Sequence, residues 1–280
     1  MAMTSPDRRS PAFWLLAVFF AVFVLFLYGP MLIIFVLSFQ GPGGGLTFPL
    51  RGLSTHWFGD LWASSRYGDL GGAFRRSIGL GLLSMIITAV ICLFAGLAFR
   101  RRFWGAGPLF YLCIVSLVVP GILLGLGISQ SFRMAGLPLR WWSSGLGAHL
   151  SWTLPFGLLI MFAVLNRFDG SWEEAARDAG ASGGQILRFV TVPILFPGLI
   201  AVALFGFTLS YDELPRSLLT VGGKNTLPIE IANMTTNVTT PALYAIGTVT
   251  SIISFMVIAA AFAAIALIQK RRARAKRGTE

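Results

Sequence analysis

The sequence predicts an all-α protein that crosses a membrane several times, and two observations support this fold class. Of the 280 residues, 55% are hydrophobic and only 12% are charged, and the mean hydropathy is +0.76. The charges are also segregated, leaving uncharged stretches of at least 23 residues at 10–50, 77–99, 103–132, 141–166, 189–211 and 231–269. About 20 apolar residues in a helix suffice to cross the hydrocarbon core of a bilayer. Six membrane-spanning helices are therefore expected.

The six spans are expected, in chain order, at 13–39, 74–99, 108–132, 146–165, 194–209 and 243–268. Residues 40–73 read as an external loop with a short interfacial helix, because tryptophan and tyrosine gather at the headgroup level of membranes. Residues 171–193 form the longest polar, helix-forming connection, and 269–280 form a basic tail. The whole chain, 1–280, is expected to be a single transmembrane domain.

The distribution of basic residues predicts the orientation. An even number of spans puts both termini on one side, and that side holds 14 of the 22 Lys and Arg residues. Because cytoplasmic loops carry the excess of Lys and Arg, both termini are expected in the cytoplasm. The net charge of +11 then reflects topology and contact with membrane lipid, so the basic tail predicts no nucleic-acid partner.

The polar connection at 171–193 reads as two short helices separated by a glycine. Ser171 and Glu174 have the spacing of a capping box, and a second box follows at 182–185. Between them, Gly180 can take the left-handed conformation that often ends a helix. Glu173 stands four residues before Arg177, the favourable order for an ion pair on a helix. On this pattern alone, a solvated surface helix between two core helices is the simpler interpretation.

The sequence gives no sign of an active site or of a bound cofactor. No serine–histidine–acid set and no cluster of metal ligands is apparent, and Cys92 and Cys113 both fall inside expected spans. The stretch 221–226 lacks the spacing of a phosphate-binding loop. An ion-coupled carrier usually needs ionisable groups in mid-membrane, and His149 is the one well inside a span. If the protein moves a solute against its gradient, the energy is therefore expected from a partner subunit.

The run Glu174-Ala175-Ala176, followed by Gly180 and then by Val190, Val192 and Pro193, resembles the EAA loop of binding-protein-dependent ABC-importer permeases. The stretches 28–39 and 207–231 are similar to the permeases for spermidine and putrescine. The resemblance covers nearly the whole chain and implies the type I ABC-importer permease fold, a bacterial inner-membrane location and no enzymatic activity in this chain.

In that family the loop forms a coupling helix that enters a cleft of the cytoplasmic ATPase. The coupling residues implied here are Glu173, Glu174, Ala175, Ala176, Arg177, Ala179 and Gly180. The implied partners are two ATPase subunits, which carry ATP and Mg, a homologous second permease subunit and a periplasmic substrate-binding protein. The small side chains at 175, 176, 179 and 180 suit an element that enters a partner's cleft.

The resemblance also points to Tyr211, Asp212 and Glu213 as candidate substrate-pathway residues, since the polyamine subgroup commonly carries two aspartates there. These carboxylates could attract a cation, or could form a helix-end ion pair with Arg216, and the sequence leaves both open. A polyamine such as spermidine or putrescine is the expected solute. The alternatives are another small organic solute for the same importer class, a stand-alone ion-coupled carrier or channel, and, more distantly, a membrane-bound enzyme.

Overall fold

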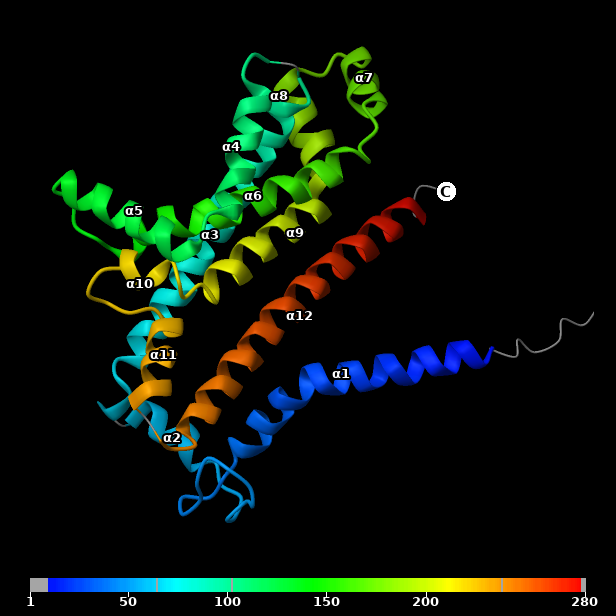
Figure 1. Cartoon of the computed structure of the whole chain (residues 1–280). Helices are drawn as coiled ribbons and strands as arrows, with labels where there is room; N and C mark the ends of the chain where they lie inside the picture. Colours follow the sequence, from blue (N-terminus) through cyan, green and yellow to red (C-terminus); the bar gives the residue numbers. More distant parts are fainter. Residues whose placement is uncertain (1–9, 64, 102, 238, 278–280) are drawn as a thin grey trace, which may run out of the picture. The chain divides into compact units, whose positions relative to one another are not determined.

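The computed structural model describes residues 10–63, 65–101, 103–237 and 239–277, and its regular structure within these ranges is helical (Figure 1). The α-helices are α1 (Pro11–Leu37), α2 (His56–Ala63), α3 (Leu70–Phe99), α4 (Ala106–Val118), α5 (Gly121–Met134), α6 (Leu146–Leu165), α7 (Ser171–Asp178), α8 (Gly183–Ile186), α9 (Val192–Tyr211), α10 (Ser217–Thr220), α11 (Leu227–Asn237) and α12 (Ala242–Arg277). Three shorter helical segments are η1 (Ser65–Tyr67), η2 (Trp141–Gly145) and η3 (Leu187–Thr191).

Among the described residues, five helices are long and apolar enough to cross a membrane, or six if α4 and α5 together make one span. The all-α membrane fold is thus confirmed, although the number of spans depends on that pair. The single helix expected over 108–132 is instead α4 and α5, which are bent by 110°. The break follows from Pro120, because a residue before proline is disfavoured in the helical region. Val119 accordingly has extended backbone angles, with φ −70° and ψ 125°.

The chain divides into two compact units, which are described separately: 1–64 with 237–252, and 65–236 with 253–280. In the first unit the glycine-rich loop after α1 is organised around the buried side chain of Gln40. Its amide accepts a hydrogen bond from the backbone N–H of Arg51 at 2.7 Å and donates to the carbonyl of Gly45 at 3.2 Å. The indole of Trp57, on α2, donates to the Gln40 carbonyl at 2.8 Å. The short helix expected in this loop is therefore α2.

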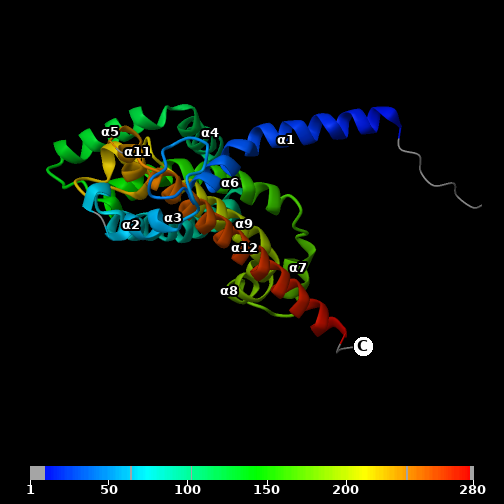
Figure 2. The ribbon, with the colours of Figure 1, turned by 90° about the horizontal axis from the view of Figure 1, so that it is seen from below.

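In the second unit α3, α6 and α9 pack on one another, and α6 and α9 run side by side in both views (Figures 1 and 2). The core cluster consists of Cys92, Leu93, Leu158, Met161, Leu165, Leu195 and Val202. The three helices approach closely at Gly157, where an added Cβ would lie 2.7 Å from Thr88 Cγ2 and 2.8 Å from Cys92 Sγ. Small residues allow this approach, which supplies the van der Waals contact that holds helices together in lipid.

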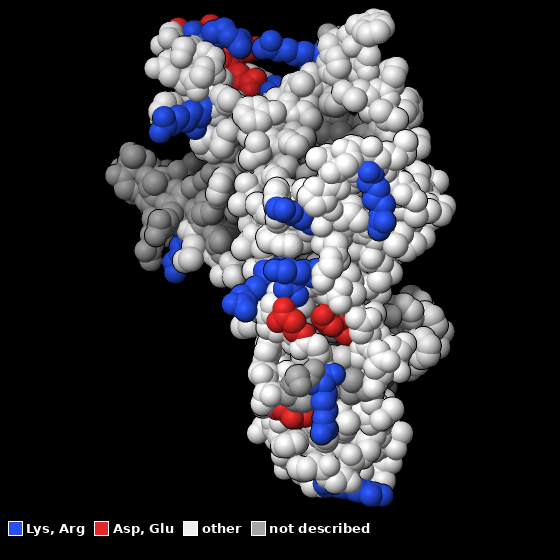
Figure 3. Space-filling view, turned by 90° about the vertical axis from the view of Figure 1, so that its left-hand side faces the viewer, with Lys and Arg blue, Asp and Glu red and all other residues white. Residues whose placement is uncertain are grey.

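The face of the molecule drawn in Figure 3 is largely uncharged: its charged side chains lie in separate groups, with broad uncharged surface between them. Along α1 most of the large apolar side chains are exposed, including Trp14, Phe19 and Phe26. The last helix, α12, extends to Arg277, so the described part of the tail expected at 269–280 is helical; residues 278–280 lie outside the described ranges.

Candidate functional site

The polar connection at 171–193 forms a compact element at the end of the second unit where α3 terminates (Figure 1). It consists of α7, a turn, α8 and η3, and η3 continues directly into α9. The segment η3 is a π-helical turn, a feature that often marks functional sites. The helical path from α8 through η3 into α9 is therefore unbroken.

The start of α7 differs from the expected capping box at Ser171 and Glu174. Gly170 is the N-cap residue and has no capping side chain, and the backbone N–H of Ser171 instead donates to Asp169 Oδ1 at 2.9 Å. The prediction of a capping box here was wrong, because the carboxylate of Asp169 lies two residues before Ser171 and accepts the hydrogen bond from its backbone N–H. Hydrogen bonds from the backbone and side chain of Ser171 hold the pKa of Asp169 below its ordinary value.

The end of α7 is a Schellman motif, as the glycine predicted. The N–H of Gly180 donates to the carbonyl of Arg177 at 2.9 Å, and the N–H of Ala181 donates to the carbonyl of Ala176 at 3.0 Å. Gly180 has a φ of +82°, and an added Cβ would meet no atom of this chain within 4 Å. The requirement for glycine therefore comes from the backbone conformation and not from crowding within the chain.

The predicted second capping box is confirmed at the start of α8. The N–H of Ser182 donates to Gln185 Oε1 at 2.7 Å, and the N–H of Gln185 donates to Ser182 Oγ at 3.4 Å. These reciprocal bonds satisfy N–H groups that a helix start leaves without partners. The turn between α7 and α8 is thus fixed on both sides, by the Schellman motif and by this box.

Glu173 does not pair with Arg177 as expected. Its Oε1 atom accepts hydrogen bonds from Arg100 Nη1 at 3.0 Å and from Thr191 Oγ1 at 2.8 Å. Burial alone would raise the pKa of Glu173, but the hydrogen bonds from Arg100 and Thr191 outweigh it, so the pKa lies below the ordinary value. The charge of Arg177 acts in the same direction without a hydrogen bond.

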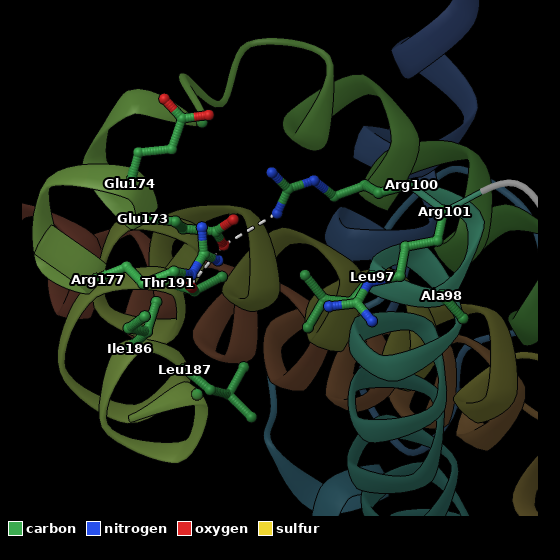
Figure 4. A pocket seen from close by; sticks show the side chains of 12 residues that line it. Leu97, Ala98, Arg100, Arg101, Glu173, Glu174, Arg177, Ile186, Leu187 and Thr191 are labelled. Carbon is green, nitrogen blue, oxygen red and sulfur yellow. Dashed lines mark hydrogen bonds and ion pairs between the residues drawn. The ribbon is translucent and has the colours of Figure 1, made fainter. Parts of the chain in front are cut away.

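A hollow of about 700 Å³ lies between this element and the end of α3 (Figure 4). Its lining residues are Leu97, Ala98, Arg100, Arg101, Gly170, Glu173, Glu174, Arg177, Gly183, Ile186, Leu187 and Thr191. In Figure 4 the Glu173 carboxylate points towards Arg100, whereas the Glu174 carboxylate points away from it. Glu174 is exposed, and so are Ala175, Arg177, Ala179 and Gly180, while Ala176 is half-buried.

Three residues in or beside this element were not identified by the sequence interpretation. Arg100, the C-cap residue of α3, was counted only among the basic residues of the side expected to be cytoplasmic, and Thr191 was not singled out. Trp172, on α7, is 59% exposed, which is unusual for so large an apolar side chain beside charged neighbours. Its place next to the glutamates was a usable signal, because tryptophan is enriched where proteins bind one another. Nothing in the sequence pointed to Arg100 as a partner, since it lies 73 residues before Glu173.

The second candidate group lies at the end of α9. Tyr211 is buried and stacks on Phe207, with ring centroids 5.6 Å apart, whereas Asp212 is exposed. Glu213 forms a buried ion pair with Arg216, with Oε1 3.1 Å from Nη1. The sequence left open whether these carboxylates attract a cation or pair with Arg216, and Glu213 forms the ion pair with Arg216. Asp212 has no ion pair among the described residues.

The ion pair belongs to a buried polar network at the same place. The Arg216 guanidinium lies over the Trp152 ring at 4.5 Å. The two ring nitrogens of His149 lie 2.7 Å from Ser210 Oγ and 2.9 Å from Ser217 Oγ. This network ties α10 and the end of α9 to α6. Among the described residues no group of three or more His, Cys, Asp or Glu could hold a metal ion.

The fold is similar to that of solved ABC transporters. The chain matches, over 96% of its length and 99% of the other chain, a solved bacterial ABC transporter that imports the acidic polysaccharide alginate, with a TM-score of 0.62 and 18% identity. It also matches the MetNI methionine ABC transporter, covering 71% of this chain and 95% of that one, with a TM-score of 0.56 and 17% identity.

The sequence relatives are more specific. The spermidine/putrescine transport system permease PotC of Haemophilus influenzae is 27% identical over 248 residues, covering 88% of this chain and 94% of the relative. PotC of Escherichia coli K12 is 28% identical over 244 residues, covering 86% and 90%. The putrescine permease PotI of the same strain is 28% identical over 259 residues, covering 87% and 86%. No protein-family model matches the chain.

The resemblance to ABC-importer permeases, and among them to the spermidine/putrescine permeases, is thus confirmed in sequence and in fold. These relatives are transport permease subunits and not enzymes. The described part of the chain has five or six helices that are long and apolar enough to cross a membrane, as expected of a multi-pass membrane protein, and the sequence is similar to transport permeases.

Proposed function

We propose that this chain is the membrane-spanning permease subunit of an ATP-driven importer that carries a polyamine such as spermidine or putrescine. The observation that carries the proposal is the element at 171–193. It is a short helix with exposed small residues, fixed by turn motifs at its end and continuous with a long apolar helix. The names of the relatives support the polyamine class.

In this proposal the chain has six spans, with α4 and α5 together counting as one, and both termini are cytoplasmic. The excess of Lys and Arg on that side supports this topology, which puts α7 and α8 in the cytoplasm and 40–73 outside. The membrane is the bacterial inner membrane, and the single transmembrane domain comprises 1–280. The second permease in the complex is a homologue of this chain.

The ATP-driven step is proposed to act through α7. Two cytoplasmic ATPase subunits bind ATP and Mg, close on each other and carry α7 with them, and the motion passes through η3 into α9. A periplasmic binding protein delivers the solute to the outward-open state. Alternating access then follows from the difference in free energy with which ATP binds the two states. The exposed carboxylate of Glu174 and the guanidinium of Arg177 supply charged contacts with the ATPase.

The solute is proposed to pass Tyr211 and Asp212. Asp212 is exposed and has no ion pair among the described residues, so its charge is available to a cationic solute. Glu213, bound by Arg216, is assigned to holding this region in place. Asp212→Asn should therefore raise the polyamine concentration needed for half-maximal uptake, as measured with labelled solute. An unchanged value for Asp212→Asn would remove this residue from the pathway.

The experiment for the proposal is uptake of labelled spermidine and putrescine into vesicles that bear the complete complex and its binding protein. Uptake that requires ATP is the expected result. ATP hydrolysis stimulated by the binding protein without polyamine uptake would keep the importer class and overturn the substrate. Solute movement by the purified chain alone, without ATPase subunits, would favour a carrier or channel.

A further inference from the structure

The two adjacent glutamates of α7 have different surroundings. Glu173 is enclosed by its bonds to Arg100 and Thr191, and its side chain is 20% exposed. Glu174 is exposed and points away from Arg100 (Figure 4). Successive residues of an α-helix are rotated by about 100°, so the two carboxylates cannot occupy one face. A single docking surface on the ATPase therefore cannot engage both side chains in the same way.

The bonds of Glu173 join α7 to two long helices. Arg100 is the C-cap residue of α3, and its guanidinium is also held over the ring of Phe168, 4.9 Å from the centroid. Thr191 is the last residue of η3, directly before α9. Both α3 and α9 contribute residues to the core of the second unit. The carboxylate of Glu173 therefore connects α7 to two of the helices that form this core.

Few other contacts hold α7 in place. None of its side chains is buried, and the large hollow separates much of the element from the end of α3. In the described part of the chain, no other side chain of α7 forms an ion pair or hydrogen bond with α3 or η3. A partly enclosed, charge-assisted pair is stronger than a fully exposed one, because water screens it less.

We propose that Glu173 is a positioning residue that clamps α7 to the ends of α3 and α9, while Glu174 makes the contact with the ATPase. The clamp transmits the displacement of α7 to both helices at once. This inference rests on the proposed function and refines it, because it takes Glu173 out of the docking surface and adds Arg100 and Thr191 to the coupling machinery.

The test compares Glu173→Gln with Glu174→Gln as the matched control in the complete complex. Two quantities are measured: the amount of ATPase that co-purifies with the permease, and the solute taken up per ATP hydrolysed. The clamp predicts that Glu173→Gln retains the ATPase while uptake per ATP falls at least tenfold. Glu174→Gln should lose most of the co-purifying ATPase. A purely structural role for Glu173 would reduce the amount of complex in the membrane and leave uptake per ATP unchanged.

The charge-swapped pair Arg100→Glu with Glu173→Arg gives a second, independent readout. It should recover at least half of the wild-type uptake per ATP, whereas each single reversal should not. If Glu173→Gln fails to reach the membrane, Thr191→Val removes one of the two bonds at nearly constant volume and should lower uptake per ATP in the same direction.

The inference is overturned if Glu173→Gln releases the ATPase as Glu174→Gln does, or if its uptake per ATP equals that of the wild type. It is also overturned if the swapped pair is no better than the single reversals. Failure of the proposed function has a different signature, since the wild-type complex itself would then show no ATP-dependent uptake.

Discussion

The conformation of Gly180 gives a prediction whose size follows from the backbone. With φ at +82° the residue lies in the left-handed region, which costs an L-amino acid about 1–2 kcal/mol. An added Cβ has open space around it, so this cost is almost purely conformational. At about 1.4 kcal/mol per factor of ten, Gly180→Ala should lower the relative population of the native turn by about 5- to 30-fold.

A series of substitutions separates backbone strain from bulk at the docking surface. Asparagine tolerates the left-handed region better than alanine although it is larger, and a β-branched residue tolerates it worst. Uptake per complex, measured with labelled polyamine in vesicles, should therefore decrease in the order Gly180, Gly180→Asn, Gly180→Ala, Gly180→Val, with the last abolishing uptake while the protein remains in the membrane.

The control for the series is Gly183→Ala. The added Cβ again meets no atom within 4 Å, but Gly183 does not have a positive φ, so uptake should be unchanged. Equal loss in Gly180→Asn and Gly180→Val, with Gly180→Ala tolerated, would refute the reasoning. That order would show that the ATPase rejects bulk at this point and that the backbone conformation is secondary.

Three further outcomes are expected. The Gly157→Ala protein should be less stable to unfolding in detergent than the matched Gly147→Ala protein by about 1–3 kcal/mol, which is the cost of over-packing. Of the two added Cβ atoms, only the one at Gly157 would lie within 3 Å of other atoms, so equal stabilities would contradict the close approach of helices there. Ser182→Ala should cost the loop about 1 kcal/mol, seen as faster hydrogen exchange of the Gln185 amide, and Ser182→Asn should restore protection. The pKa of Glu173 lies below its ordinary value of 4.5, so the carboxylate contributes its full stabilisation of the folded state above about pH 4.5 and loses it as the pH falls through the lowered pKa. Uptake per ATP should therefore show no titration of Glu173 between about pH 5.5 and 8.

Local signals in the sequence determined much of this protein. The uncharged apolar runs established the membrane fold, because about 20 apolar residues have no other favourable environment than lipid or a buried core. The stop at Gly180 and the capping box at 182–185 were also predictable, since both depend on hydrogen bonds within a few residues of chain. The motif around Glu174 carried the resemblance to importer permeases.

The tertiary structure decided which charged groups are partners. Glu173 has a possible partner four residues along its own helix, yet it bonds to Arg100, because packing of α3 beside the loop brings that guanidinium to a partly enclosed position. Glu213 is likewise engaged by Arg216 in a buried network, which leaves Asp212 as the exposed carboxylate. The energy of an ion pair depends on burial and on the distance between its atoms, and both are set by how the helices pack.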